Sequence, residues 1–352
     1  MKRLLTILAV LLLASSAHAD ESIQLARMNP AVLGSGGSAG CTASYGSPIS
    51  PQNNCSDIGG SESSATTGWT STTCDPFDGA GTAKTGDYAL RATADGGAAD
   101  LFYRAFSGLD ASTMYKLSFS LRHNGSATGT GRWICWLSRS NTNQQTFVDI
   151  DKDNKTYVDY TQYFYFNDYM DNFGCTEANA ENDGGVYLDD YKLTTASPCL
   201  SDELYTFADA ASIDSETNGV SGWNLTTAGS GVLESVTTDP QHGSHHIRFL
   251  ANGANDRFQR DISSILETGH KYFVSAKLKS VAGGAFLCYL ATSHTINQDI
   301  SWYIAAGTDW RHMGSSVVHD GSAIYLGCVE YSATDNSEIY IDSISIKEIL
   351  SE

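Results

Sequence analysis

The chain has 352 residues, of which 40 are acidic and 21 are basic, so its formal net charge is −19. This charge repels phosphate backbones and anionic membranes, and it excludes nucleic-acid binding as a main role. Charged residues make up only 17% of the chain, and the remaining polarity comes largely from Ser, Thr, Asn and Gly. That balance is typical of an extracellular β-protein and not of a disordered acidic tail.

Residues 1–19 have the pattern of a secretory signal peptide. Lys2 and Arg3 precede an apolar run from Leu4 to Leu13, and Ala17-His18-Ala19 is a small-x-small cleavage site. The run is shorter than the roughly 20 residues of a membrane helix, and no later stretch approaches that length. We therefore expect a secreted protein, extracellular or on the cell surface, without membrane insertion. The alternative, an N-terminal membrane anchor, fits the flanking residues less well.

Residues 20–58 are expected to form a flexible arm that leads into a disulfide-pinned loop, because Gly and Ser dominate residues 34–40 and no apolar period follows. Within this stretch, Gly36–Gly40 matches G-x-S-x-G letter for letter. A nucleophile elbow needs a strand before it and a helix after it, so we interpret the match as linker.

A stretch near residues 69 to 193 recurs in the same order near 223 to 346. The matching positions are Trp69 and Trp223, Leu90-Arg91 and Ile247-Arg248, Arg104 and Arg260, Tyr115–Ser118 and Tyr272–Ser275, Ile134–Leu137 and Leu287–Leu290, Cys175 and Cys328, and Tyr187–Asp189 and Tyr340–Asp342. Such a period is far longer than a solenoid unit, so it predicts two whole domains.

Within each repeat, short segments of alternating polarity are separated by Gly, Asn, Asp and Ser clusters, and helical periodicity is nearly absent. The alternation is clearest in Tyr115–Leu121, Val186–Leu193 and Ile339–Ile346. The pattern predicts an all-β chain with two tandem antiparallel jelly-roll β-sandwich domains, at residues 59–197 and 198–352.

Eight cysteines in an exported chain are expected to be mostly oxidised. The second repeat holds only Cys288 and Cys328, at the positions of Cys135 and Cys175, so one disulfide inside each repeat is the simplest pairing. The remaining cysteines leave three connectivities open: Cys41, Cys55, Cys74 and Cys199. A zinc site is disfavoured because the chain has no C-x-x-C pair.

Several short motifs together resemble carbohydrate-binding modules of the galactose-binding-like jelly-roll kind. In the first repeat they are Gly68-Trp69, Gly86-Asp87-Tyr88-Ala89-Leu90, Tyr115–Phe119 and Tyr187–Asp190; in the second they are Gly222-Trp223, Gly243, Ile247, Tyr272 and Tyr340-Ile341-Asp342. The resemblance implies a noncatalytic domain that binds glycans through aromatic side chains, often with a structural calcium near the last strand. The second repeat departs from the pattern at His245, which replaces the tyrosine of Gly-x-Tyr.

Aromatic side chains on an outward sheet face are the expected glycan contacts, because sugar rings stack their C–H faces on Tyr and Trp. If Tyr160 points inward, as Trp310 is taken to do at the equivalent position, alternation buries Phe164 and Phe166. The same alternation on the two cysteine-bearing strands turns further aromatics outward. The predicted ligand-binding residues are Trp136, Tyr157, Tyr163, Tyr165 and Tyr289, whereas Trp69 and Trp223 are assigned to the core. Burial of these aromatics in a core or a domain interface is the competing interpretation.

A structural calcium ion is the expected cofactor, with Asp189 and Asp342 as its equivalent ligands. Asp149-x-Asp151-x-Asp153 resembles the start of a calcium loop, but it lacks the required glycine and has Tyr160 where the closing Glu would stand. We interpret it as a solvated turn.

No catalytic site is predicted. His245 and His246 are adjacent on an expected strand and point to opposite faces, so with His242 they would not face one metal ion. The sequence therefore predicts an exported, noncatalytic protein whose partner is a glycan or polysaccharide. The alternative is a structural subunit of a surface layer, appendage or matrix. In that case an arm at residues 22–33 and the tyrosine-rich faces would contact further copies of the chain or other surface proteins.

Overall fold

The computed structural model describes residues 41–49, 69–71, 74–78, 83–95, 101–111, 113–123, 132–138, 145–151, 153–167, 170–177, 182–213, 215–226, 231–253, 255–291, 298–307, 309–322, 325–331 and 336–352. All of them belong to one compact unit, residues 37–352. The signal peptide, the G-x-S-x-G match and most of the arm lie outside the described residues and remain predictions. Among the described residues, no helix has the length and hydropathy to cross a membrane.

The described chain is built almost entirely of β-strands. The first half contains β2 (Trp69–Ser71), β3 (Cys74–Asp78), β4 (Tyr88–Asp95), β5 (Leu101–Ala105), β6 (Met114–His123), β7 (Arg132–Ser138), β8 (Gln145–Asp151), β9 (Val158–Tyr165), β10 (Asn172–Glu177) and β11 (Asn182–Ser197). The second half contains β13 (Trp223–Thr226), β14 (Val232–Val236), β15 (His246–Ala251), β16 (Arg257–Asp261), β17 (Lys271–Ala282), β18 (Phe286–Ala291), β19 (Gln298–Ile304), β20 (Arg311–Val318), β21 (Tyr325–Glu330) and β22 (Ser337–Ser351). Two short strands, β1 (Ser44–Tyr45) and β12 (Cys199–Leu200), and a 3-10 turn at Ser263–Ile265 complete the fold.

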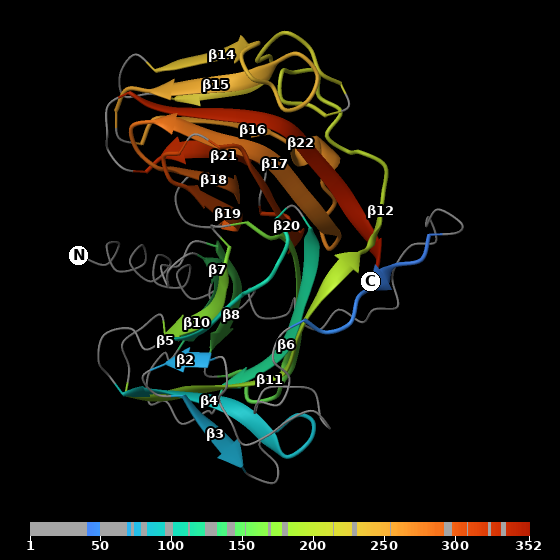
Figure 1. The fold of residues 1–352 in the computed structure, drawn as a ribbon, viewed down its shortest axis with the longest axis vertical. Coiled ribbons are helices and arrows are strands. Elements are labelled where there is room, and N and C mark those ends of the chain that lie inside the picture. Colours follow the sequence, from blue (N-terminus) through green and yellow to red (C-terminus); the bar gives the residue numbers. More distant parts are fainter. Residues whose placement is uncertain are drawn as a thin grey trace, which may run out of the picture. The chain divides into compact units, whose positions relative to one another are not determined.

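Each half has the strand connectivity of a jelly roll, which confirms the predicted fold class. In the first half, β4-β11-β6-β9 and β5-β10-β7-β8 lie in separate antiparallel sheets. In the second half, β15-β22-β17-β20 and β16-β21-β18-β19 repeat that order (Figure 1). In both halves eight strands therefore form two Greek-key layers.

Strand alternation supplies the core. On β6, Tyr115, Leu117, Phe119 and Leu121 are buried at every second position, and the equivalent positions of β17 are buried too. Alternate side chains of a strand point to one face. These rows therefore pack against the five-stranded sheet of their own half, β2-β5-β10-β7-β8 or β13-β16-β21-β18-β19, which we call its short sheet. Trp69 and Trp223 are both in the core, as predicted.

Disulfides join neighbouring strands of each short sheet. Cys135 on β7 is bonded to Cys175 on β10, and Cys288 on β18 to Cys328 on β21, so both predicted pairs are confirmed. Of the three connectivities left open for the other cysteines, the structure contains the bond from Cys41 to Cys199. Cys55 lies outside the described residues.

The two halves share one continuous sheet. β9 of the first half pairs antiparallel with β20 of the second, with Phe164 opposite Ser315. The Tyr163 backbone N–H donates to Ser316 Oγ (2.9 Å), and Gln162 Nε2 donates to the Ser316 carbonyl (2.9 Å). We call the resulting twelve-stranded sheet the long sheet. The domain boundaries at residues 59, 197 and 198 remain predictions.

Candidate functional site

Two of the predicted ligand-binding aromatics are buried. Trp136 and Tyr289 point away from the core cysteines, as alternation requires, but only 1% and 0% of their surfaces are exposed. Each lies opposite a glycine on the paired strand, Gly174 and Gly327. A Cβ on Gly174 would lie only 2.5 Å from the Trp136 ring, so the glycine lets the indole lie flat on the sheet. The expectation that these two rings are exposed is therefore wrong.

Tyr163 also lies on the predicted face but is fully buried. Its ring packs with Phe273 and Ile349, its hydroxyl is 3.0 Å from that of Tyr45, and the Lys271 ammonium is 5.2 Å from its ring centre. The alternation on β9 is confirmed, because Phe164 and Tyr160 contact the core from the opposite face. The expected exposure of Tyr163 is wrong because the second half covers it.

The proposed equivalence of Tyr160 and Trp310 is wrong by three residues. Leu121 pairs with Val158, and its counterpart Leu278 pairs with Arg311, so Trp310 corresponds to Tyr157. Tyr160 is instead stacked on Phe119, with ring centres 5.6 Å apart.

Tyr157 belongs to a row of alternating aromatic rings and cations on the outer face of the long sheet. The Arg122 guanidinium lies between Tyr157 and Tyr187, 5.1 and 4.5 Å from their ring centres. In the second half, the Lys279 ammonium is 6.0 Å from the ring centres of both Trp310 and Tyr340. These cations already occupy the faces of the rings. The contacts between rings and cations therefore stabilise neighbouring strands of the sheet. Ligand binding by the half-buried Tyr157 stays a prediction.

Asp189 and Asp342 are buried carboxylates that hold loops by hydrogen bonds. Asp189 Oδ2 accepts the backbone N–H groups of Lys84 (2.6 Å) and Thr85 (3.2 Å). Asp342 Oδ2 accepts those of Gln241 (2.5 Å) and His242 (3.0 Å). Burial raises the pKa of Asp189 to about 6 and also raises the pKa of Asp342.

The arrangement around these two carboxylates does not fit a calcium ion well, because N–H donors point at the oxygens that an ion would use. The described side chains include no cluster of three or more His, Cys, Asp or Glu that could hold a metal ion. Calcium at Asp189 and Asp342 stays a prediction, and a bound ion would have to replace these hydrogen bonds.

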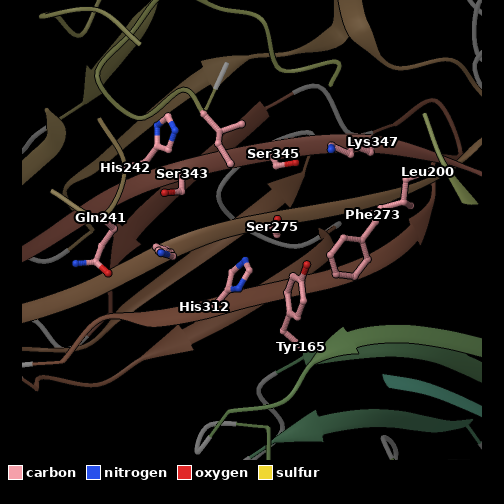
Figure 2. Close-up of a pocket in the computed structure, with 12 residues that line it drawn as sticks. Tyr165, Leu200, Gln241, His242, Phe273, Ser275, His312, Ser343, Ser345 and Lys347 are labelled. Carbon is pink, nitrogen blue, oxygen red and sulfur yellow. The ribbon is translucent and has the colours of Figure 1, made fainter. Parts of the chain in front are cut away.

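A groove on the outer face of the long sheet holds the fifth predicted aromatic, Tyr165. The cavity volume of this groove is about 260 Å³. Strands β9, β17, β20 and β22 form its floor, and segments near residues 200, 213 and 241 line it further. The lining residues are Tyr165, Leu200, Ile213, Gln241, His242, Phe273, Ser275, Lys277, His312, Ser343, Ser345 and Lys347 (Figure 2).

Three rings form an aromatic wall along the groove. Tyr165 stacks on His312 with ring centres 3.9 Å apart, and it meets Phe273 edge to face at 5.1 Å. Gly314 makes this possible, since a Cβ there would lie 2.4 Å from the Tyr165 ring and 2.8 Å from Phe273. Tyr165 of the first half thus extends over β20 of the second. Burial and the neighbouring Lys277 lower the pKa of His312 to about 4, so its ring is neutral at pH 7.

A loop at residues 239–245 forms one end of the groove, where Figure 2 shows Gln241 and His242. Asp342 holds it from below through the Gln241 and His242 N–H groups. Glu216 holds it from the other side, accepting the backbone N–H groups of Ser244 (2.8 Å) and His245 (2.7 Å). The buried carboxylate of Asp342 and the half-buried carboxylate of Glu216 therefore fix the position of the loop.

Sequence reasoning found one ring of this site and missed the rest. Tyr165 was placed on the correct face by alternation along β9. His312 and Phe273 carry no recognisable motif, and they meet Tyr165 only because β9 pairs with β20. Gly314 is the local signal in the sequence, because a glycine inside a strand often marks a place where another group packs closely against the backbone.

Comparison with known proteins finds similar solved structures at low sequence identity and low TM-score. No family model matches the chain, and no curated protein matches it. The tandem CBM22-1–CBM22-2 domains of Paenibacillus barcinonensis Xyn10C are 12% identical, with 86% of this chain and all of that chain covered and a TM-score of 0.31. The C-terminal family 22 carbohydrate-binding module of Clostridium thermocellum Xyn10B is 18% identical, covering 38% of this chain and 89% of that one, with a TM-score of 0.30.

A third similar structure is the enzymatically active domain of bacteriophage CBA120 tailspike protein 4. It is 16% identical, and the match covers 39% of this chain and 22% of that chain, with a TM-score of 0.32. Further similar structures include single carbohydrate-binding modules. The jelly-roll assignment of this chain rests on its own strand order.

Proposed function

We propose that this protein binds carbohydrate noncatalytically in the groove beside Tyr165. One observation carries the proposal: an aromatic wall faces hydroxyl and amide side chains within a single open cavity. The apolar C–H face of a sugar ring packs on such a wall, while ring hydroxyls exchange hydrogen bonds with groups such as Gln241, Ser275 and Ser343. The remaining polar positions of the groove extend this hydrogen-bonding surface.

The groove supports binding rather than hydrolysis. Cleavage of a glycosidic bond generally needs two carboxyl groups flanking the scissile bond. None of the described residues that line the groove is Asp or Glu. Export of the protein is part of the same proposal, supported by three disulfides, which persist in oxidising compartments.

Purified protein should bind an immobilised glycan or insoluble polysaccharide saturably, and calorimetric titration should give the affinity. Tyr165→Ala removes the central ring of the wall. It should weaken binding at least about tenfold, because an aromatic ring packed against a ligand contributes on the order of 1 kcal/mol or more to the binding free energy. Tyr165→Phe keeps the packing and should bind nearly normally. Tyr331→Ala is the matched control, because Tyr331 is 66% exposed and lies outside the groove.

Two results would contradict the proposal. One is the absence of binding to every glycan tested by a folded, monomeric protein. The other is binding that Tyr165→Ala leaves unchanged while its thermal unfolding matches that of the parent. Large assemblies in light scattering, together with no glycan binding, would favour the structural-subunit alternative instead.

A further inference from the structure

We infer that the ligand of this groove is an acidic saccharide, with carboxylate or sulfate groups on its sugar rings; the inference rests on the proposed function. Lys277 and Lys347 both line the groove, and none of the described lining residues carries a carboxylate. In a chain with 40 acidic and 21 basic residues, a groove lined by two lysines and no acid runs against the overall composition.

Neither lysine has an ion-pair partner among the described side chains, whereas Lys84, Lys271 and Lys279 each do. Both residues are half-buried where they line the groove, so each places an ammonium group there without a compensating protein charge. A ligand carboxylate or sulfate would supply that charge through charge-assisted hydrogen bonds.

Three carboxylates close to lining residues of the groove already accept hydrogen bonds. Glu203 accepts the Ser345 hydroxyl (2.6 Å) and the Ile346 N–H (2.7 Å). Glu216 and Asp342 accept backbone N–H groups of the 239–245 loop, and His242 Nδ1 is 3.8 Å from Glu216. These acids are therefore occupied in shaping the groove walls and are not among its lining residues.

The first half provides an internal comparison. At the positions equivalent to Lys277, His312 and Ser343 it has Ser120, Asp159 and Asp190. There the Lys84 ammonium binds Asp159 and is 3.1 Å from Asp190, so this cluster is closed by its own ion pairs. The second half has neither acid, and its lysine stands at the position of Ser120 and not at that of Lys84, where it has Gln241. Its lysine is therefore left open to a ligand.

The spacing of the two lysines predicts a ligand of more than one sugar ring. Lys347 is paired with Phe273, which precedes Lys277 by four residues on β17. Strand geometry therefore separates the two lysines by roughly 13 Å along the sheet. Figure 2 shows Lys347 and Leu200 at the end of the groove opposite His242, with Phe273 beside them and with Tyr165 and His312 between the two ends.

The net charge of the protein opposes any anion at long range, but screening limits that repulsion to about 8 Å at physiological ionic strength. The described side chains that line the groove include two ammonium groups and no carboxylate. Acidic ligands should therefore bind through local contacts even though the protein as a whole is anionic.

The test is calorimetric titration at about 0.15 M salt with an oligogalacturonate, its fully methyl-esterified form, a sulfated galactan oligosaccharide and inorganic sulfate alone. The acidic oligosaccharide should bind at least about tenfold tighter than its methyl ester, as charged hydrogen bonds warrant. Lys277→Ser and Lys347→Thr, the residues of the first half, should each remove most of that preference. Lys155→Ser, an exposed lysine outside the groove, is the control.

Each other outcome has a distinct meaning. Equal affinity for the acid and its methyl ester would overturn the charge inference and leave carbohydrate binding standing. If inorganic sulfate binds as tightly as the oligosaccharide, the groove is a site for free anions, and the inference that its ligand is a saccharide is overturned. No binding of any oligosaccharide, here and on a broad glycan panel, would overturn the proposed function as well.

Discussion

Single residues in this protein are placed by buried carboxylates that hold loop backbones. Asp189 and Asp342 occupy equivalent positions on β11 and β22, and the residue after each, Asp190 or Ser343, has a positive φ of 52° or 53°. The irregular backbone turns the carboxylate toward the N–H groups of a neighbouring loop. The sequence repeat identified both acids but could not show that they accept hydrogen bonds from peptide N–H groups, because the loops they hold are distant in sequence.

The raised pKa of Asp189 predicts a pH-dependent stability. Its folded-state pKa of about 6 lies above the unfolded value, so its stabilising contribution is complete below about pH 4 and is lost as the pH rises through 6. The loss amounts to about 3 kcal/mol by pH 7. Asp189→Asn stays neutral, so urea unfolding at pH 4 and 7 should show wild type losing stability relative to this variant.

Asp202→Asn, at an exposed carboxyl group, serves as the control for the change of side chain. A stability difference between wild type and Asp189→Asn that stays constant from pH 4 to 7 would show that Asp189 is not the group responsible.

At the scale of elements, equivalent loops of the two halves, near residues 84 and 241, differ in whether they close over the sheet. In the first half, Thr85 Oγ1 donates to Asp190 (2.5 Å) and Lys84 binds the neighbouring acids, so the loop closes over the sheet. In the second half, the 239–245 loop is held by Asp342 and Glu216 and leaves a groove beside it. Gly243 is essential to this arrangement, with φ +59° and no room for a side chain.

Gly243→Ala should move the loop and weaken ligand binding. Its Cβ would lie 1.2 Å from Glu216 Oε2, and the left-handed backbone adds roughly 1–2 kcal/mol of strain. Gly269→Ala is the matched control, because φ is +86° there but no atom lies within 4 Å of the added Cβ. Both variants should unfold at lower temperature in a thermal melt, and only Gly243→Ala should lose affinity. Equal affinities would separate the loop from the binding site.

Much of each half could be predicted from the sequence, and little of what lies between the halves. Alternation and the repeat gave the jelly-roll class, both matching disulfides and the face of Tyr165. Alternation alone could not decide between exposure and burial of Trp136 and Tyr289, because the glycines opposite them are identified only from the strand pairing. The groove could not be predicted either, since it requires the register of two strands that are distant in sequence.

At the scale of the molecule, the long sheet and the core connect the two halves. Buried apolar residues of both halves belong to one contiguous cluster, and β9 and β20 carry the sheet across the junction. Asn167 adds a hydrogen bond to the His312 carbonyl (3.3 Å), which ties the end of β9 to the groove. A substitution that removes packing in one half should therefore also destabilise the other half.

Unfolding is expected to be a single cooperative transition. Leu117→Ala, a fully buried change in the first half, should cost about 2–5 kcal/mol and lower the whole transition. Differential scanning calorimetry should give one peak with a calorimetric enthalpy close to the van't Hoff enthalpy. A second peak, left in place by Leu117→Ala, would show that the halves unfold independently.

The pairing of β9 with β20 also obeys a two-fold symmetry. Phe164 and Val317 are equivalent positions, as are Gln162 and Ser315, so the observed pair of Phe164 with Ser315 maps onto the pair of Gln162 with Val317. Contacts of this self-complementary kind are those by which identical subunits form dimers. The chain can thus be regarded as a dimer whose subunits are covalently joined: the linker makes their association independent of concentration. The two halves differ at the groove: Lys277, His312 and Ser343 of the second half stand where the first half has Ser120, Asp159 and Asp190.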